Sequence, residues 1–193
     1  MVNPVDPAEI RFTGENSYIV LKDSPDAPAT SRISHWRALM SAAGPGHVCF
    51  ILSELTDNQV QIYSDNPALA RWLQEEIEKV INPHFDDQST PIMEATFSRE
   101  GDGMASSTEK ISSQDTEISL SWSDLSEPFL LHVQPGAIPG LTHGVYSVLR
   151  PARKAQVVIN AKRARGQASP RELAGHPSST CALAWSETWV RPR

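Results

Sequence analysis

Cysteine is scarce in this chain of 193 residues, where only Cys49 and Cys181 occur. Both lie in apolar stretches that predict strands, and a free cysteine in such a place behaves as a small buried hydrophobe. A disulfide between them would need an oxidising compartment, yet the first residues lack the basic start and apolar stretch of a secretory signal. We therefore expect a reduced, cytoplasmic protein.

Long apolar runs are also missing. The longest uninterrupted one, Val48 to Leu52, is far shorter than the roughly 20 residues that a membrane-spanning helix needs. No membrane partner is therefore expected. The apolar share of 39% is typical of a globular chain, and the length predicts a single domain over residues 1–193.

Several catalytic and cofactor motifs are absent. The sequence contains no G-x-S-x-G nucleophile elbow, no G-x-x-x-x-G-K-[ST] phosphate loop and no G-x-G-x-x-G dinucleotide loop. Its histidines and cysteines do not have the spacing of metal ligands, so we expect no metal and no cofactor. The basic part of the chain has no interleaved aromatic residues, and no nucleic-acid partner is expected.

The clearest helix signal covers residues 67–81. The segment Asp65-Asn66 supplies a capping side chain, and Pro67 occupies the first helical position, where its missing N–H costs nothing. Apolar residues then recur at three-and-four spacing, with charged residues on the other side. Asn82-Pro83 ends the run. This pattern predicts one amphipathic helix that packs on a sheet and presents only solvated charges on its polar face.

A short N-terminal helix is predicted at residues 31–43, where Ile33, Trp36 and Met40 follow the helical period before Gly44-Pro45. Most of the remaining chain shows the alternation or the short apolar runs of β-strands. Strands are predicted at residues 17–21, 48–52, 60–63, 93–97, 118–122, 129–133, 145–150, 156–160 and 180–190.

The connections between these strands decide the fold class. Residues 151–154 are predicted to be a tight connection, and the Gly- and Ser-rich stretch 101–116 a mobile loop, with a short strand at Lys110-Ile111 as the alternative. Strands joined by short turns favour a curved antiparallel sheet or barrel. The predicted fold is therefore mainly β (α+β), with the helix at about 67–81 packed on the sheet.

This strand spacing resembles that of calycin-like barrels, which bind small ligands. The early G-x-W signature of lipocalins and the paired histidines of cupins are absent, and no family is assigned. The resemblance implies a small-molecule pocket enclosed by the curved sheet.

Glu187 is the most unusual residue of the predicted strands. Because side chains two apart share a face of a regular strand, Glu187 is expected between Trp185 and Trp189. An aromatic surrounding raises the pKa of a carboxyl group, which suits it to acid/base work or to anchoring a ligand. The alternative is a strand end that frays into water.

We favour a protein that binds a small molecule in a β-barrel or sheet pocket. The candidate ligand-binding residues are Trp122, His132, Tyr146, Arg150, Trp185, Glu187 and Trp189. If the sheet stays open, the face with His132 is instead its solvent side.

Two other functions remain open at this point. One is a cofactor-free hydrolase, isomerase or decarboxylase that uses Glu187 and His132 as an acid/base pair. The other is an interaction module or homodimer that uses the basic stretch 150–171, in a chain whose net charge is −6.

Overall fold

The computed structural model describes residues 9–192 and is mainly β. In chain order the strands are β1 (Ile10–Lys22), β2 (Ala29–Ser41), β3 (Gly46–Ser53), β4 (Val60–Ser64), β5 (Ile92–Glu94), β6 (Thr96–Gly101), β7 (Ser106–Ser113), β8 (Thr116–Leu125), β9 (Phe129–Val133), β10 (Gly144–Ile159), β11 (Lys162–Arg163), β12 (Pro170–Leu173), β13 (His176–Ser179) and β14 (Cys181–Val190). The helical elements are η2 (Glu54–Thr56), α1 (Pro67–Leu73), the π-turn η3 (Gln74–Glu78), α2 (Lys79–Ile81) and η4 (Pro83–Phe85).

One sheet runs through almost the whole chain in the order β5-β4-β3-β2-β1-β14-β10-β8-β7-β6. Strand β9 pairs with the first half of β10, and β8 pairs with its second half. The strand pairs of this sheet are antiparallel except β4 with β5. Residues 92–101 pair first with β4 and then with β7, so they connect the two ends of the sheet. The predicted curved sheet is confirmed as a nearly closed barrel.

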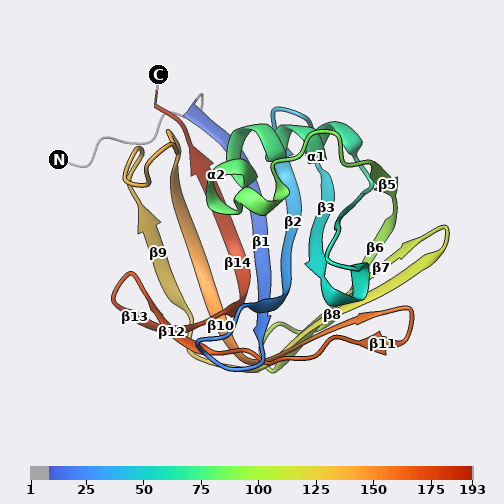
Figure 1. Cartoon of the computed structure of the whole chain (residues 1–193). Coiled ribbons are helices and arrows are strands. Elements are labelled where there is room, and N and C mark those ends of the chain that lie inside the picture. Colours follow the sequence, from blue (N-terminus) through green and yellow to red (C-terminus); the bar gives the residue numbers. More distant parts are fainter. Residues whose placement is uncertain (1–8, 193) are drawn as a thin grey trace.

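Two apolar cores lie on the two faces of this barrel wall. Inward side chains from all the main strands, among them Ile33, Ile51 and Trp122, fill the interior. The outer face of β1, β2 and β3 is covered by the helical segment, which runs from α1 to η4 (residues 67–85) and buries Trp36 and Phe50 (Figure 1). The cysteines Cys49 and Cys181 belong to the inner core as buried free thiols, and burial raises the pKa of both.

The helix predicted at residues 67–81 is confirmed. The side chain of Asn66 caps it by accepting a hydrogen bond from the backbone N–H of Leu69 at 3.2 Å. The prediction of a wholly solvated polar face is wrong for Glu78, which is completely buried. The π-turn adds a residue to one turn and rotates the later residues of the helix, which explains how Glu78 reaches the sheet. No helix within residues 9–192 has the length and apolar character to cross a membrane.

The helix predicted at residues 31–43 is wrong, because this segment lies in β2. Its inward residues Ile33 and His35 and its outward residues Ser34 and Trp36 are all buried, the latter pair under the helical segment. A strand that is covered on both faces loses the simple polar and apolar alternation that would have identified it.

Two predicted connections are also replaced by strand. Half of the expected loop 101–116 forms the hairpin strand β7, which includes Lys110 and Ile111, and Ile111 is buried in the inner core. Residues 151–154 are not a turn, since β10 continues through them and changes partners from β9 to β8.

Candidate functional site

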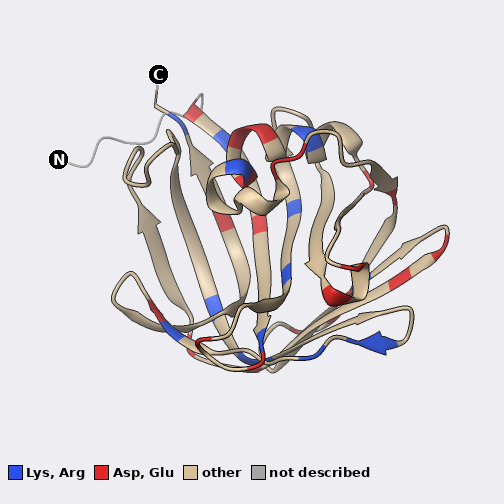
Figure 2. Cartoon of the chain, in the orientation of Figure 1, with Lys and Arg blue, Asp and Glu red and all other residues tan. Residues whose placement is uncertain are grey.

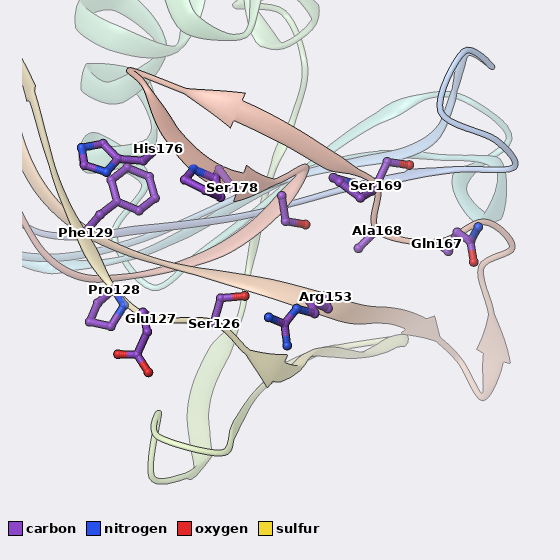
Figure 3. A pocket seen from close by; sticks show the side chains of 13 residues that line it. Ser126, Glu127, Pro128, Phe129, Arg153, Gln167, Ala168, Ser169, His176 and Ser178 are labelled. Carbon is purple, nitrogen blue, oxygen red and sulfur yellow. The ribbon is translucent and has the colours of Figure 1, made fainter.

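A cavity of about 660 Å³ lies between the β12–β13 hairpin and the junction of β8 with β9 (Figure 3). We call it the hairpin cavity. It is lined by Ser126, Glu127, Pro128, Phe129, Arg153, Gln167, Ala168, Ser169, Pro170, His176, Pro177, Ser178 and Ser179. Its volume is within the range of small-molecule sites, which is about 300 to 1,000 Å³.

The base of the hairpin is fixed to β1. Lys22 and Gln167 exchange two backbone hydrogen bonds, at 3.1 and 2.9 Å. Arg171 of β12 donates a hydrogen bond to the hydroxyl of Tyr18 at 2.7 Å, and its guanidinium group lies 5.2 Å from the centre of the same ring. These contacts hold one wall of the cavity against the barrel.

The tip of the hairpin contacts the opposite wall through two stacked rings. The rings of Phe129 in β9 and His176 in β13 are 4.7 Å apart and nearly parallel, at 15°. Figure 3 shows this pair at one end of the cavity and Gln167 at the other. The hairpin therefore bridges the cavity from β1 to β9 and keeps it open between its two ends.

The lining combines rigid apolar surface with a few polar groups. Three prolines, Phe129 and Ala168 supply the apolar part. Arg153 and Gln167 supply hydrogen-bond donors, and Ser169 and Ser179 supply hydroxyl groups from residues that are themselves buried. An apolar wall with a small number of placed polar groups is typical of sites for small organic ligands.

None of the residues predicted to bind a ligand lines this cavity. Trp122 and Trp189 are core residues whose indole N–H groups are already used. Trp122 donates to the backbone carbonyl of Tyr18 at 3.1 Å, and Trp189 donates to the carboxyl group of Glu187 at 2.5 Å. Neither tryptophan presents a free face as a pocket wall.

The expected position of Glu187 between two tryptophans is wrong because β14 contains a bulge. Val148 pairs with Ser186 while Leu149 pairs with Ala184, so Trp185 is an extra residue. The bulge changes the alternation. Leu183 therefore faces the inner core, whereas Trp189 lies in the outer core.

Glu187 is buried beneath the helical segment, on the outer face of the wall. Burial raises the pKa of its carboxyl group to about 7, although the hydrogen bond from Trp189 acts in the opposite direction. Glu78 is the second buried carboxyl here and accepts hydrogen bonds from Ser34, from Trp36 at 2.5 Å and from Asn82 at 2.8 Å.

The other four candidate residues lie on the inward side of the wall. His132 stacks on Tyr146 at 4.3 Å, and the guanidinium group of Arg150 lies 4.8 Å from the ring of Trp185, which is 37% exposed. Tyr146 neighbours Ser147, which pairs with Glu187, so successive side chains place His132 and Glu187 on opposite faces. The predicted acid/base pair is therefore wrong in its geometry.

The basic stretch 150–171 is extensively paired within the chain. Arg153 and Lys154 lie 3.3 and 3.6 Å from the carboxylate of Asp124, and Arg165 lies 2.5 Å from that of Glu54. In Figure 2 the basic strand β11 lies at the opposite end of the barrel strands from the acidic positions of the helical segment. The pairing reduces the charge that this stretch could offer to a partner.

Sequence reasoning missed the hairpin cavity because most of its wall comes from segments outside the predicted strands. The available signal was composition, since Pro128, Pro170 and Pro177 lie beside four serines in these short segments. Within residues 9–192 no group of three or more His, Cys, Asp or Glu side chains is arranged to hold a metal ion. Comparison with protein-family models, curated proteins and solved structures gives no match.

Proposed function

We propose that this protein binds a small organic molecule in the hairpin cavity. The observation that carries the proposal is a preformed cavity of about 660 Å³ whose two ends are fixed, at the base by β1 and at the tip by the ring pair of Phe129 and His176. A preformed site avoids the cost of ordering loops when the ligand binds.

The lining favours a ligand with an apolar ring or chain and a hydroxyl or acidic group. The prolines and Phe129 match the apolar part, and the serine hydroxyl groups and Arg153 match the polar part. Arg153 makes one ion pair, with Asp124 at 3.3 Å, and is largely exposed, so its remaining N–H groups are available to an oxygen of the ligand.

Filling the cavity should abolish binding. Ala168→Phe adds a ring to a half-buried position in the cavity wall, and we expect native mass spectrometry of this variant, purified from its own host, to lose the small-molecule adduct of the wild-type protein. The matched control is Ala137→Phe, the same change at an exposed loop position. A wild-type spectrum without an adduct, or an adduct retained by Ala168→Phe, would contradict the proposal.

A further inference from the structure

A second set of polar side chains lies at one end of the barrel interior, away from the hairpin cavity. Its members are Glu15, Arg37, His47, Arg99 and Glu109, and we call it the mouth cluster. Glu15 lies in β1, Arg37 in β2, His47 in β3, Arg99 in β6 and Glu109 in β7. Five strands thus contribute one ionisable residue each to the same end of the barrel.

Arg99 makes the shortest ion pairs with both carboxylates of the cluster. Its Nη2 donates to Glu15 at 2.5 Å, and its Nε donates to Glu109, which is almost fully buried. Burial raises the pKa of Glu109, and Arg99 acts against that shift. Arg37, in contrast, makes only one contact with Glu15, at 3.4 Å, and its side chain is 43% exposed. Most of the N–H donors of Arg37 are therefore available.

Arg37 and His47 are direct cross-strand neighbours in β2 and β3. The Nδ1 atom of His47 lies 2.8 Å from Asp65, which leaves the Nε2 atom on the other side of the ring. Each side chain already has one carboxylate partner, Glu15 for Arg37 and Asp65 for His47. The remaining N–H groups of Arg37 and the Nε2 edge of His47 stay available to a ligand that lies next to both side chains.

A cavity of about 270 Å³ lies at this point and is lined by Arg37, His47, Phe97, Ser98, Arg99 and Glu109. The ring of Phe97 stacks on that of His47 at 5.1 Å and forms an apolar wall. Both guanidinium groups of the cluster thus line one small space. Its size suits a compact ligand rather than the larger molecule proposed for the hairpin cavity.

His35 lies directly beneath these two rings. Its ring centre is 5.9 Å from that of Phe97 and 6.5 Å from that of His47. It is completely buried, and within the described residues neither of its ring nitrogens has a hydrogen-bond partner. Burial, together with the nearby Arg99, lowers the pKa of His35 to about 3, so its ring is neutral. A buried polar group without a partner is costly and calls for an explanation, such as a water molecule or another bound group beside the ring.

We propose that the mouth cluster is a binding site for a small oxyanion, a carboxylate or a phosphate, held by Arg37 and His47. Arg37 donates a forked pair of hydrogen bonds and His47 presents its Nε2 edge. Arg99 keeps the buried carboxylate of Glu109 paired beside the anion. This site is independent of the hairpin cavity and does not require the function proposed above.

The test is a two-dimensional NMR titration of the full chain with sodium phosphate, and separately with sodium acetate, each against sodium chloride at the same ionic strength. We expect saturable shifts of the signals of residues around Arg37, His47 and Phe97 with phosphate, acetate or both. Phosphate alone or acetate alone identifies the class of oxyanion. Shifts that chloride reproduces, or the absence of saturable shifts with both salts, would overturn the proposal.

The variant for this test is Arg37→Gln, whose side chain is half exposed and makes one long ion pair. We expect its affinity for the anion to fall roughly tenfold or more, because a charge-assisted forked contact is lost. Arg163→Gln, at an exposed position of β11, should leave the affinity unchanged. If Arg37→Gln does not fold, His47→Gln gives the same comparison. Equal affinities in these variants and the wild-type protein would also overturn the proposal.

Discussion

Replacing Glu187 by glutamine is expected to raise the free energy of unfolding at pH 8 by about 3 kcal/mol. The carboxyl group is buried beside Trp189 and Ser147, and its pKa is raised from the ordinary value of 4.5 to about 7. At pH 8 the folded protein must hold a buried negative charge. Glutamine keeps an oxygen acceptor for the indole N–H of Trp189 without that charge.

The sign of the pH dependence is set by the direction of this shift. The folded state binds the proton of Glu187 more tightly than the unfolded state does. Its contribution to stability is therefore fully present below about pH 4.5 and is lost as the pH rises through about 7. The pKa of Glu78 is also raised by burial, so it changes the wild-type stability in the same direction.

Urea unfolding of the wild-type protein and of Glu187→Gln at pH 5 and at pH 8 measures this effect. The two proteins should have similar stability at pH 5 and differ by the full amount at pH 8. Glu172→Gln removes an exposed carboxyl group of β12 and should follow the wild-type protein at both pH values. A difference between the wild-type protein and Glu187→Gln that does not change with pH would contradict the assignment of a buried, titrating Glu187.

Trp122→Ala is expected to lower the free energy of unfolding by about 3 to 5 kcal/mol. Trp122 is completely buried in the inner core and packs in the barrel interior with residues of several strands. Its removal leaves a cavity that the surrounding barrel wall fills only in part. It also leaves the carbonyl group of Tyr18 without the indole donor.

Trp185→Ala is the matched control, because Trp185 is the same residue type and is 37% exposed at the bulge of β14. We expect this change to cost about 1 kcal/mol or less, mainly through the lost contact with the guanidinium group of Arg150. Denaturant unfolding of both variants gives the comparison. Equal losses of stability in the two variants would contradict the assignment of Trp122 to the core and of Trp185 to the surface.

The sequence predicted those elements whose signals are local. The helix at residues 67–81 has its capping residue Asn66 and a proline at its first position, and β9 coincides with the predicted strand at residues 129–133. The strands predicted at residues 48–52 and 60–63 likewise lie in β3 and β4, which pair as a hairpin. Such signals act over a few residues and do not depend on how the sheet closes.

The errors arose where tertiary structure overrides local pattern. Strand β2 is covered on both faces, so Ile33 and Trp36 mimic a helical period. The π-turn rotated Glu78 toward the outer face of the sheet, and the bulge at Trp185 moved Glu187 to the face opposite to the predicted one. In a strand, one inserted residue reverses the inward or outward direction of the residues that follow it. No feature of the sequence marked the π-turn or the bulge.

The candidate site was harder to predict than the fold for the same reason. The hairpin cavity forms because the β12–β13 hairpin contacts both β1 and β9. These two strands are more than a hundred residues apart in the sequence and come together only in the folded chain. The raised pKa of Glu187 was predicted correctly in direction, but of its two predicted neighbours Trp189 is correct and Trp185 is wrong. The residue type of Glu187 was enough to predict the direction of its pKa shift, whereas its position in the fold could be known only from the topology of the sheet.

The most direct test of the proposed function is electron density in a crystal structure of the protein purified from its own host. We predict density for a small organic molecule in the hairpin cavity, with its apolar part against Phe129 and Ala168 and a polar group toward Arg153. A cavity that contains only ordered water, or a β12–β13 hairpin collapsed onto β9, would contradict the account.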